Sequence, residues 1–415
     1  MSREWRQWRR LGAPRLVVQW LRSGVPLRWR GPAPKEGVRQ WGPQDPRVQR
    51  EIGDLVKAGA FIQLKGAIES PTFLIPKKGG GQRLIHDLRG INRCLVPPKF
   101  SLRGAREAAQ LVRSSKWLAS LDLRHGYQQV AMSEDARRFL GARWGNRTVA
   151  STVLPFGLSI SPYVFTRITN WLARVIRMKT GLKVVVYIDD FLLGGQSEEE
   201  VRKGIEDIKK LFIQLGVKTS EDKEVGPAKK IPFLGFEWDA QSKTVSVPLE
   251  RRAEYRRGVR NLLRHPQTRA VWRTVIGKLL FLAEAVGPAM RHTRSLMWAS
   301  AKRSKLIEAL GEAKLDLEWW EQALSGPLEM PLVLKPVSAA ITTDASDTGL
   351  GFLIDMRRQG ANKADGLPSK EFIQFKGAGA AQDSEAHINQ KELEALLRVL
   401  ECHGEQLRGQ RVVWY

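Results

Sequence analysis

The chain has 415 residues, of which 68 are Lys or Arg and 43 are Asp or Glu, so its formal net charge is +25. Apolar residues make up 42% and charged residues 27%, proportions that exclude a wholly disordered chain and a membrane-embedded one. A folded protein with this excess of positive charge is expected to bind a polyanion, with nucleic acid as the first expectation and an anionic membrane surface as the second.

The cysteines and the apolar runs predict the compartment. Cys94 and Cys402 are the only cysteines and form no C-x-x-C spacing, so neither a disulfide framework nor a structural zinc site is expected. No uncharged apolar stretch approaches the roughly 18 residues that span a bilayer, and residues 16–18 are too short for the core of a signal peptide. We therefore expect an intracellular protein of the nucleus or cytoplasm, neither secreted nor bound to a membrane.

The first part of the chain opens with an irregular basic segment. Residues 1–45 are rich in Arg, Trp, Pro and Gly, a composition that predicts an extended segment without a core of its own. Two apolar-rich runs at 72–76 and 82–87 flank Lys77-Lys78-Gly79-Gly80-Gly81, which predicts a β-hairpin with a basic tip. The patterns that follow predict a helix at 105–112, a strand at 117–122, and a strand pair at 139–144 and 147–154.

The clearest local signals lie between residues 184 and 215. A β-branched run at 184–188 ends in Asp189-Asp190 and is followed by another apolar run, so the two acids are expected at the tip of a tight hairpin. Ser197 and Glu200 form a capping box for a helix at 198–215 with one apolar face. Such a helix must cover a sheet, so the fold class predicted here is α+β, with helices crossing a mostly antiparallel sheet.

The rest of the chain divides into a helical segment and a second α/β pattern. Residues 246–326 follow helical patterns with a strong excess of positive charge. After a Pro-rich link, residues 337–415 are expected to form strands at 339–343, 351–354 and 411–415 and a helix at 389–402. Four arginines in the helical segment are spaced so that they lie near one side, which favours phosphate binding over a plain solvated surface: Arg252, Arg256, Arg260 and Arg264.

Three aspartates at strand ends are candidate metal ligands: Asp122, Asp189 and Asp190. Adjacent acids repel each other unless a cation lies between them, and carboxylate oxygens suit Mg²⁺ or Mn²⁺. Two such ions about 3.5–4 Å apart can activate an attacking hydroxyl and stabilise a leaving phosphate oxygen. A lone Asp-Asp pair more often makes a turn, but the basic surroundings, the preceding apolar strand and the separate Asp122 favour a metal site.

Four segments together resemble those of reverse transcriptases, and they occur in the order of that family. Tyr187-Ile188-Asp189-Asp190 resembles the Y-x-D-D box, residues 121–130 the first carboxylate motif, 154–158 the template-positioning segment and 233–236 the primer grip. The resemblance covers about residues 46–238. Within retroelement enzymes the chain is most similar to DIRS-like retrotransposons, although other LTR-type elements and pararetroviruses share much of the pattern. The subfamily resemblance rests on Arg89-Gly90-Ile91-Asn92, on residues 343–347, and on His387-Ile388-Asn389 with Glu392.

The resemblance implies a right-hand polymerase, with fingers and an α+β palm at 46–245, a helical thumb at 246–326, and a partial ribonuclease H-like α/β domain at 337–415. It implies RNA-directed DNA polymerase activity, in which a primer 3′-hydroxyl is extended on an RNA or DNA template with deoxynucleotides. Two Mg²⁺ ions, or Mn²⁺ in their place, would be the cofactors.

The resemblance also implies roles for single residues around the metals. Asp122 and Asp189 would bind both ions, with the Leu123 carbonyl as a further ligand, and Asp190 would complete the acidic cluster. Tyr127 would lie under the sugar, where its ring crowds a 2′-hydroxyl and selects deoxynucleotides. The segment that positions the primer would comprise Phe233, Leu234 and Gly235.

Basic residues would hold the triphosphate. Arg83, together with Lys77 or Lys78, would clamp it by charge-assisted hydrogen bonds. Lys223 falls where the family has a lysine near the leaving pyrophosphate, so it is either a general acid or a solvated lysine in an acidic stretch. Phe156 stands where retroviral enzymes carry Gln, which predicts altered sugar contacts without loss of activity.

The C-terminal segment resembles the start of a ribonuclease H domain. Asp344 at a strand end and Glu392 in a helix would be two of its metal ligands. The third carboxylate of that family follows the strand that corresponds to 412–415, where this chain stops, so little or no ribonuclease H activity is expected. The alternative is that Asp344 is a turn residue and Glu392 a solvated helix acid.

Two other functions are compatible with part of the sequence. A decayed or repurposed copy would bind nucleic acid without catalysis, but the presence of all three aspartates disfavours it. A basic protein of membrane surfaces would need a long amphipathic stretch with a lipid-ready apolar face, which the sequence lacks.

Overall fold

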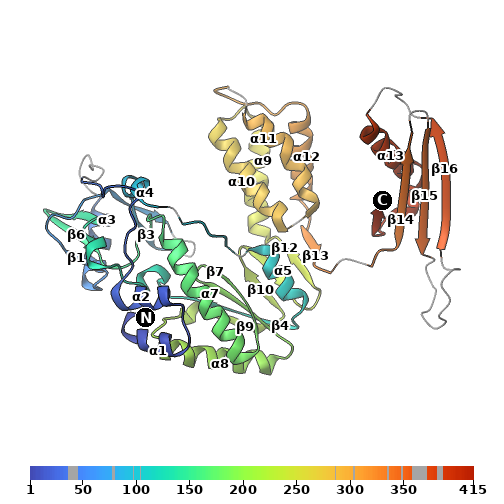
Figure 1. Ribbon diagram of the computed structural model, residues 1–415. Coiled ribbons are helices and arrows are strands. Elements are labelled where there is room, and N and C mark those ends of the chain that lie inside the picture. Colours follow the sequence, from blue (N-terminus) through green and yellow to red (C-terminus); the bar gives the residue numbers. More distant parts are fainter. Residues whose placement is uncertain are drawn as a thin grey trace. The chain divides into compact units, whose positions relative to one another are not determined.

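The chain forms two compact units. The computed structural model describes residues 1–35, 45–76, 80–96, 98–102, 104–285, 287–301, 304–333, 336–346, 349–357, 372–380 and 387–415. The units are Met1–Leu332 and Val333–Tyr415 (Figure 1), and the division falls close to residue 337, where the C-terminal domain was predicted to start. Within the described ranges, every helix is too short or too polar to span a bilayer.

A four-stranded antiparallel sheet, here called the central sheet, lies at the heart of the first unit, in the order β7-β8-β4-β9. Successive side chains of a strand point to opposite faces, and this decides the packing. Val184 and Val186 join one core with the helices α7 and α8, while Val185 joins another core with α5 and with buried residues of segment 231–238. The elements are α5 (Ala105–Arg113), β4 (Trp117–Asp122), α7 (Ser161–Thr180), β7 (Lys183–Tyr187), β8 (Asp190–Gly195), α8 (Glu198–Gln214) and β9 (Val225–Ala228). This arrangement confirms the predicted α+β class.

Helix α8 matches its prediction, whereas α7 was not predicted. The Ser197 hydroxyl accepts the backbone N–H of Glu200 at 3.1 Å, but the Glu200 carboxylate accepts the N–H of Gln196 at 2.6 Å instead of returning to Ser197. In α7, eleven of the twenty residues are buried. Because buried side chains surround most of that helix, its sequence lacks the one-sided apolar period that reveals a surface helix.

The prediction that residues 1–45 are extended and coreless is wrong for residues 5–23. Helices α1 (Trp5–Arg10) and α2 (Arg15–Ser23) bury Trp8 and Trp20 in the core that contains α7 and α8. The Trp8 indole N–H donates to the Leu215 carbonyl at 2.9 Å. The composition argument failed because these helices complete a core that a later part of the chain supplies.

A smaller β-rich region carries the predicted hairpin. Strands β2 and β3 pair antiparallel and form the predicted hairpin. A three-stranded sheet in the order β1-β6-β5 packs against α3, and its strands β5 and β6 are the strand pair predicted at 139–144 and 147–154. Lys77 and Lys78 lie outside the described residues. The elements are α3 (Pro46–Lys57), β1 (Phe61–Gln63), β2 (Thr72–Pro76), β3 (Gln82–His86), α4 (Arg89–Cys94), β5 (Gly141–Trp144) and β6 (Arg147–Ser151).

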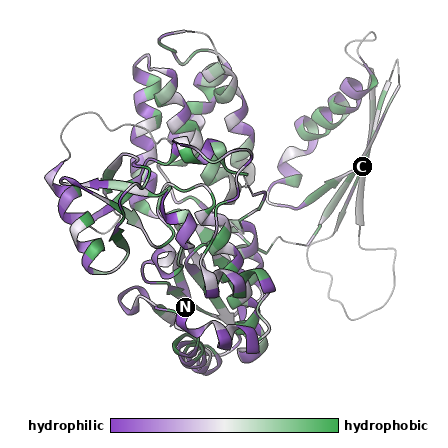
Figure 2. Ribbon diagram, turned by 60° about the vertical axis from the view of Figure 1, so that its left-hand side comes forward, coloured by the Kyte–Doolittle hydropathy of each residue, from purple (hydrophilic) through white to green (hydrophobic). Residues whose placement is uncertain are grey.

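Helices α9 to α12 form a helical bundle at residues 249–323, inside the segment predicted to be helical. Hydrophilic and hydrophobic residues lie on different sides of these helices (Figure 2), and Trp272 and Trp320 are fully buried between them. The four-stranded sheet β10-β11-β12-β13 adjoins the bundle. The elements are β10 (Lys230–Phe233), β11 (Phe236–Asp239), β12 (Thr244–Ser246), α9 (Leu249–Arg264), α10 (Arg269–Ala285), α11 (Arg294–Ala301), α12 (Glu312–Ala323) and β13 (Glu329–Pro331).

The second unit is a mixed sheet with one described helix. Strands β14, β15 and β16 are antiparallel, and β17 adds parallel to β14. Helix α13 packs Val399 against Ile341 and Ile354 of the sheet. The three predicted strands and the predicted helix are confirmed with longer or shorter bounds, as β14 (Ala339–Ala345), β15 (Gly349–Arg357), β17 (Val412–Trp414) and α13 (Ile388–Leu407). Strand β16 (Phe372–Ala380) was not predicted.

Candidate active site

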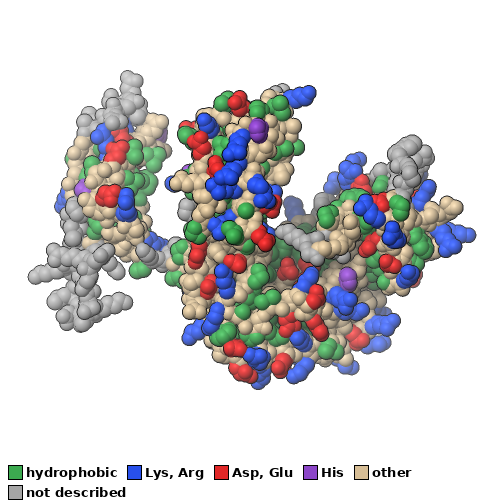
Figure 3. Space-filling model, turned by 180° about the vertical axis from the view of Figure 1, so that it is seen from behind, with side chains coloured by type: hydrophobic (Ala, Val, Ile, Leu, Met, Phe, Trp, Pro, Cys, Tyr) green, Lys and Arg blue, Asp and Glu red, His purple; other side chains and the backbone are tan. Residues whose placement is uncertain are grey.

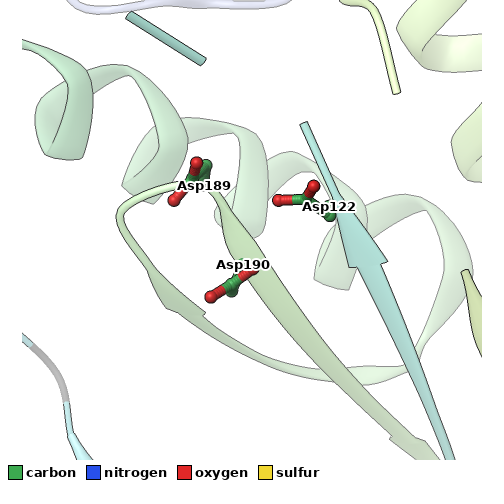
Figure 4. A group of neighbouring side chains, drawn as sticks. All are labelled: Asp122, Asp189 and Asp190. Atoms are coloured by element: carbon green, nitrogen blue, oxygen red, sulfur yellow. The ribbon is translucent and has the colours of Figure 1, made fainter. Parts of the chain in front are cut away.

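Three carboxylates meet at one end of the central sheet. Asp122 ends β4, Asp189 lies in the turn after β7, and Asp190 begins β8 directly opposite Asp122 in the strand register. One oxygen from each lies within 4.8 Å of the others (Figure 4). Ile188 adopts the uncommon φ of +56°, which lets the chain reverse within two residues. The hairpin predicted for the two adjacent acids is confirmed, and it brings them to Asp122.

The electrostatics of this cluster favour a bound cation. Burial, and then the nearby charge of Asp122, raises the pKa of Asp189. Burial, followed by the charges of Asp189 and Asp122, raises the pKa of Asp190 to about 7. Lys223 Nζ donates to Asp122 Oδ2 at 2.7 Å, and this hydrogen bond raises the pKa of Lys223. One ammonium group does not neutralise three carboxylates, so the oxygen-rich site fits a hard divalent ion.

Backbone contacts hold the acids in place. The Leu123 N–H donates to the Asp189 carbonyl at 3.2 Å, and the Asp122 carbonyl accepts the Ser220 N–H at 2.9 Å. Gly126 is packed so closely that a Cβ there would lie 3.3 Å from the Asp189 Cβ. Leu123, proposed as a backbone ligand, is therefore a direct neighbour of the cluster.

The predicted substrate residues that the structure describes come together beside the acids. The ring centroids of Tyr127 and Phe156 are 5.0 Å apart, and the Arg83 guanidinium lies 4.6 Å from the Phe156 ring centroid. Burial, and then the charge of Asp189, raises the pKa of Tyr127 to about 12, so its phenol stays neutral. Arg83, Phe156 and Tyr127 thus form a continuous row that leads to the carboxylates.

Two residues that position this row were not predicted as site residues. The backbone N–H of His86 donates to the Phe156 carbonyl at 3.0 Å. The Asn92 side chain donates to the Gly157 carbonyl and accepts the Ser159 N–H, both at 2.9 Å. Asn92 belongs to the Arg-Gly-Ile-Asn segment noted in the sequence, so its presence there was the available signal. Nothing in the local sequence of His86 indicates its contact with a loop far along the chain.

The burial of His86 predicts an acid-sensitive fold. Burial lowers the pKa of His86 from 6.5 to about 4. Between these two pH values the unfolded chain binds a proton that the folded chain does not, so the free energy of unfolding falls as the pH falls. We expect the urea concentration at the unfolding midpoint of the unit Met1–Leu332 to be lower at about pH 5 than at about pH 7. This difference should be smaller in His86→Gln. Parallel decreases in both proteins would contradict this assignment.

The predicted primer-grip residues border the carboxylates. A pocket of about 230 Å³ is lined by Asp122, Asp190 and Lys223 together with residues 232–235. Leu234 and Gly235 have φ values of +51° and +77° in the turn between β10 and β11. The buried Phe233 anchors this turn in the core.

Arg251 of α9 is a further residue at this turn. It occupies the space beside Gly235, because a Cβ on that glycine would lie 1.7 Å from an Arg251 Nη atom. The Arg251 guanidinium also lies 5.4 Å from the Phe281 ring centroid. The sequence placed Arg251 on the positive face of this helix, but its contact with Gly235 was not predicted, since that contact depends on how α9 packs.

The arginine face predicted on α9 is turned toward α12. Arg260 Nε donates to Glu321 at 2.6 Å, Arg256 lies 3.7 Å from the same carboxylate, and Arg252 donates to the Gly326 carbonyl. These three side chains are half-buried and have partners within the protein. Their binding of phosphate stays a prediction. Arg264, at the end of α9, is exposed. The i, i+4 spacing correctly placed the residues on one side, but it did not show what that side contacts.

In the second unit, the residue that contacts Glu392 is Thr343, the neighbour of Asp344. The Thr343 hydroxyl donates to the Glu392 carboxylate at 3.3 Å, so the Thr343 side of β14 faces α13. Neighbouring strand residues point to opposite faces, and Asp344 is exposed on the other one. The joint metal-binding role of Asp344 and Glu392 stays a prediction.

Comparison with known proteins identifies the domain that carries the site. Residues 75–238 match the family model described as reverse transcriptase (RNA-dependent DNA polymerase). The chain thus contains a reverse transcriptase domain. That domain includes Asp122, Asp189, Asp190 and the row formed by Arg83, Phe156 and Tyr127.

The relatives are retroelement and viral polyproteins. The chain is 24% identical over 399 residues to the enzymatic polyprotein of cauliflower mosaic virus (strain Strasbourg), covering 93% of this chain and 56% of the relative. It is 26% identical over 195 residues to the retrovirus-related Pol polyprotein from transposon gypsy of Drosophila melanogaster, covering 46% of this chain and 19% of the relative. The chain thus spans about half the length of the viral polyproteins that it matches.

Solved structures share the fold. A foamy viral protease-reverse transcriptase in complex with double-stranded DNA superposes with a TM-score of 0.65 at 17% identity, covering 100% of this chain and 74% of that one. The same kind of protein in complex with an RNA/DNA hybrid gives a TM-score of 0.62 at 19% identity, covering 95% and 51%. The right-hand polymerase fold expected from the sequence is confirmed, and a ribonuclease H-like C-terminal unit is consistent with these neighbours.

Proposed function

We propose that this chain is an RNA-directed DNA polymerase that extends a primer 3′-hydroxyl with deoxynucleotides. The observation that carries the proposal is the cluster of Asp122, Asp189 and Asp190, whose oxygens lie within 4.8 Å inside a reverse transcriptase domain. A non-catalytic nucleic-acid-binding protein would not need three clustered acids in a strongly basic chain, two of which, Asp189 and Asp190, have a pKa raised by burial and by neighbouring carboxylates.

The cluster would hold two Mg²⁺ ions, with Mn²⁺ as a substitute. When bound, the ions activate the attacking hydroxyl and stabilise the leaving phosphate oxygen. Asp122 and Asp189 would each contact both ions, with the Leu123 carbonyl as a further ligand, and Asp190 would complete the negative field. Carboxylate oxygens are the ligand type that these hard ions prefer.

The remaining residues would bind and orient the nucleotide. The Arg83 guanidinium, stacked on Phe156, would form charge-assisted hydrogen bonds with the triphosphate. Lys223 stays protonated at neutral pH, because its hydrogen bond to Asp122 raises its pKa, and would offset the charge that develops on the leaving pyrophosphate. Phe233, Leu234 and Gly235, which line the same pocket as Asp190, would support the primer end.

The template and primer would occupy the hollow between the helical bundle and the β-rich region. Figure 3 shows this hollow bordered by Lys and Arg side chains. The solved neighbours hold double-stranded DNA and an RNA/DNA hybrid, which supports a duplex in the corresponding place. Contacts between Lys or Arg side chains and the phosphate backbone of a nucleic acid depend little on its base sequence. Both RNA and DNA templates are therefore proposed to bind.

Tyr127 would select the sugar, and its removal should relax that choice. The ring packs between Phe156 and Phe165 and cannot move away from the nucleotide site without breaking both contacts. We expect Tyr127→Val to increase the use of ribonucleotides relative to deoxynucleotides by roughly 10- to 200-fold, the usual value of one steric contact. Tyr127→Phe keeps the ring and should keep the discrimination. The ratio of kcat/KM values for dCTP and CTP measures both, and equal ratios in the Val and Phe variants would contradict the role.

Primer extension tests the proposed function directly. The full chain would be incubated with a primed RNA template, the four deoxynucleotides and Mg²⁺, with a primed DNA template in parallel and EDTA as the control. Extension that requires the metal is the expected result. Duplex binding without extension on either template would favour a decayed or repurposed copy.

The assignment to DIRS-like retrotransposons is a narrower proposal. It is supported by Arg89-Gly90-Ile91-Asn92, by residues 343–347 and by His387-Ile388-Asn389 with Glu392. Asn92 has a structural reason to be in the first of these segments, because it fixes the loop at residues 157–159.

A further inference from the structure

The two N-terminal helices carry a set of exposed arginines. On α1 and the turn before it, Arg3, Arg6 and Arg10 recur at intervals that place them on one side, opposite the buried Trp8. On α2, Arg15 and Arg22 share one side with Gln19, while Trp20 and Leu21 are buried. The exposed members of this arginine face are Arg3, Arg6, Arg9, Arg10, Arg15 and Arg22.

One aromatic ring joins the arginines of the two helices into a single surface. The guanidinium of Arg6 lies 5.1 Å from the Trp5 ring centroid, and that of Arg22 lies 5.2 Å from the same ring. Two cations held at one ring repel each other and gain from an anion between or beside them. Within the described part of the chain, no ion pair joins any arginine of this face to a carboxylate.

The face is held rigidly on the first unit. Helices α1 and α2 lie beside α7 and α8 (Figure 1), and all four contribute to one core. The Trp171 indole N–H donates to the Gly12 carbonyl between α1 and α2 at 3.3 Å, and the Trp8 indole N–H donates to Leu215. The arginines are therefore pre-arranged, and a ligand does not have to order the helices that carry them.

We propose that the arginine face of α1 and α2 binds the phosphate backbone of single-stranded RNA, as a contact separate from the polymerase site. Guanidinium groups form paired hydrogen bonds with phosphate oxygens, and six of them on 22 residues match a polyanion better than a single phosphate. The Trp5 ring is covered by two guanidinium groups, so the face has no free aromatic platform to read bases, and binding should not depend on sequence.

A membrane surface fits this face poorly. An amphipathic helix binds a bilayer by inserting its apolar side. Here the apolar sides of both helices, with Trp8, Val17, Trp20 and Leu21, are buried in the protein core. What remains exposed is the charged side alone.

This inference rests on the proposed function for the identity of the RNA, which would be the unpaired template. A second contact on the same molecule raises the local concentration of template at the polymerase site. The contribution should be largest for long unpaired templates and absent for a primed template with only a few unpaired nucleotides.

The test compares the full chain with Arg6→Gln/Arg10→Gln/Arg22→Gln. The probe is a fluorescein-labelled 40-nucleotide oligouridylate, and fluorescence anisotropy gives its Kd at several salt concentrations. We expect the Kd to rise roughly tenfold and the slope of log K against log salt to decrease by about 2, since each lost phosphate contact on a single strand contributes about 0.7. Arg202→Gln/Lys203→Gln/Arg408→Gln removes the same charge from α8 and from the end of α13 and should leave the Kd nearly unchanged.

Three outcomes would overturn the inference. Equal Kd values for the two triple variants would show that only net charge matters. Unchanged RNA binding with lost binding to phosphatidylserine vesicles would show a membrane contact instead. A lower unfolding midpoint in the Arg6, Arg10 and Arg22 variant would show that these side chains hold the helices in place. Extension of a primer on a short template reports the polymerase site separately, so a parent that binds RNA at this face but does not extend would refute the proposed function alone.

Discussion

Asp189→Asn is expected to abolish primer extension while sparing duplex binding. Asn keeps the size of the side chain but removes one of the three charges that are needed to hold the divalent ions. The extension rate should fall by about a hundred- to a thousandfold, which is the loss typical when a group that stabilises developing charge is removed. Binding of a primed duplex should be equal or slightly tighter, because the substitution removes negative charge from a surface that faces phosphates.

A matched carboxylate elsewhere provides the control for this variant. Asp207 lies on α8 and forms only a 3.7 Å surface pair with Lys210, so Asp207→Asn should extend like the parent. Rapid single-nucleotide incorporation at saturating Mg²⁺ measures the rates, and gel shift measures duplex binding. If Asp189→Asn lost duplex binding together with extension, Asp189 would be a structural acid and the metal site would have to be reassigned.

Gly157→Ala is expected to be the most destabilising single methyl addition in the reverse transcriptase domain. Gly157 has a φ of +102°, and a Cβ there would lie 1.9 Å from the His86 carbonyl oxygen. Relief requires the backbone of β3 or of the loop to move, which would break the hydrogen bond from the His86 backbone N–H to Phe156. We expect the free energy of unfolding to decrease by about 3 kcal/mol or more, a loss typical of substitutions that strain the backbone and overpack the core.

The effect of the clash can be separated from that of the backbone angle. Gly59 has a φ of +73°, but nothing lies within 4 Å of the position that a Cβ would take there, so Gly59→Ala carries only the cost of the angle, about 1–2 kcal/mol. Urea denaturation followed by tryptophan fluorescence gives both values. Equal losses in the two variants would mean that the loop at 157 moves freely, and Phe156 would then not be held beside Tyr127 by this packing.

Elements with strong local signals were predictable from the sequence. Residues 184–195 were correctly predicted as a hairpin because β-branched residues fit a pleated, buried surface and the turn must fall at the acids. Helix α8 was predictable because Ser197 satisfies an N–H at the helix start and the apolar residues repeat on one face. The carboxylate cluster was predictable from the hairpin, which carries Asp189 and Asp190, and from Asp122, which ends the neighbouring strand.

Only the tertiary structure decided what each exposed-looking face contacts. The arginines of α9 lie on one side as predicted, but that side meets Glu321 of α12. The apolar sides of α1 and α2 are buried only because α7 and α8 complete their core. Asp344 and Glu392 have the right order in the chain, yet the alternation along β14 turns Thr343 toward Glu392 instead. Local sequence determines which side chains share a face of a strand or helix, since the direction of each side chain follows from the backbone conformation of that element. The partner of each face is set by packing between segments far apart in the chain, which no local pattern encodes.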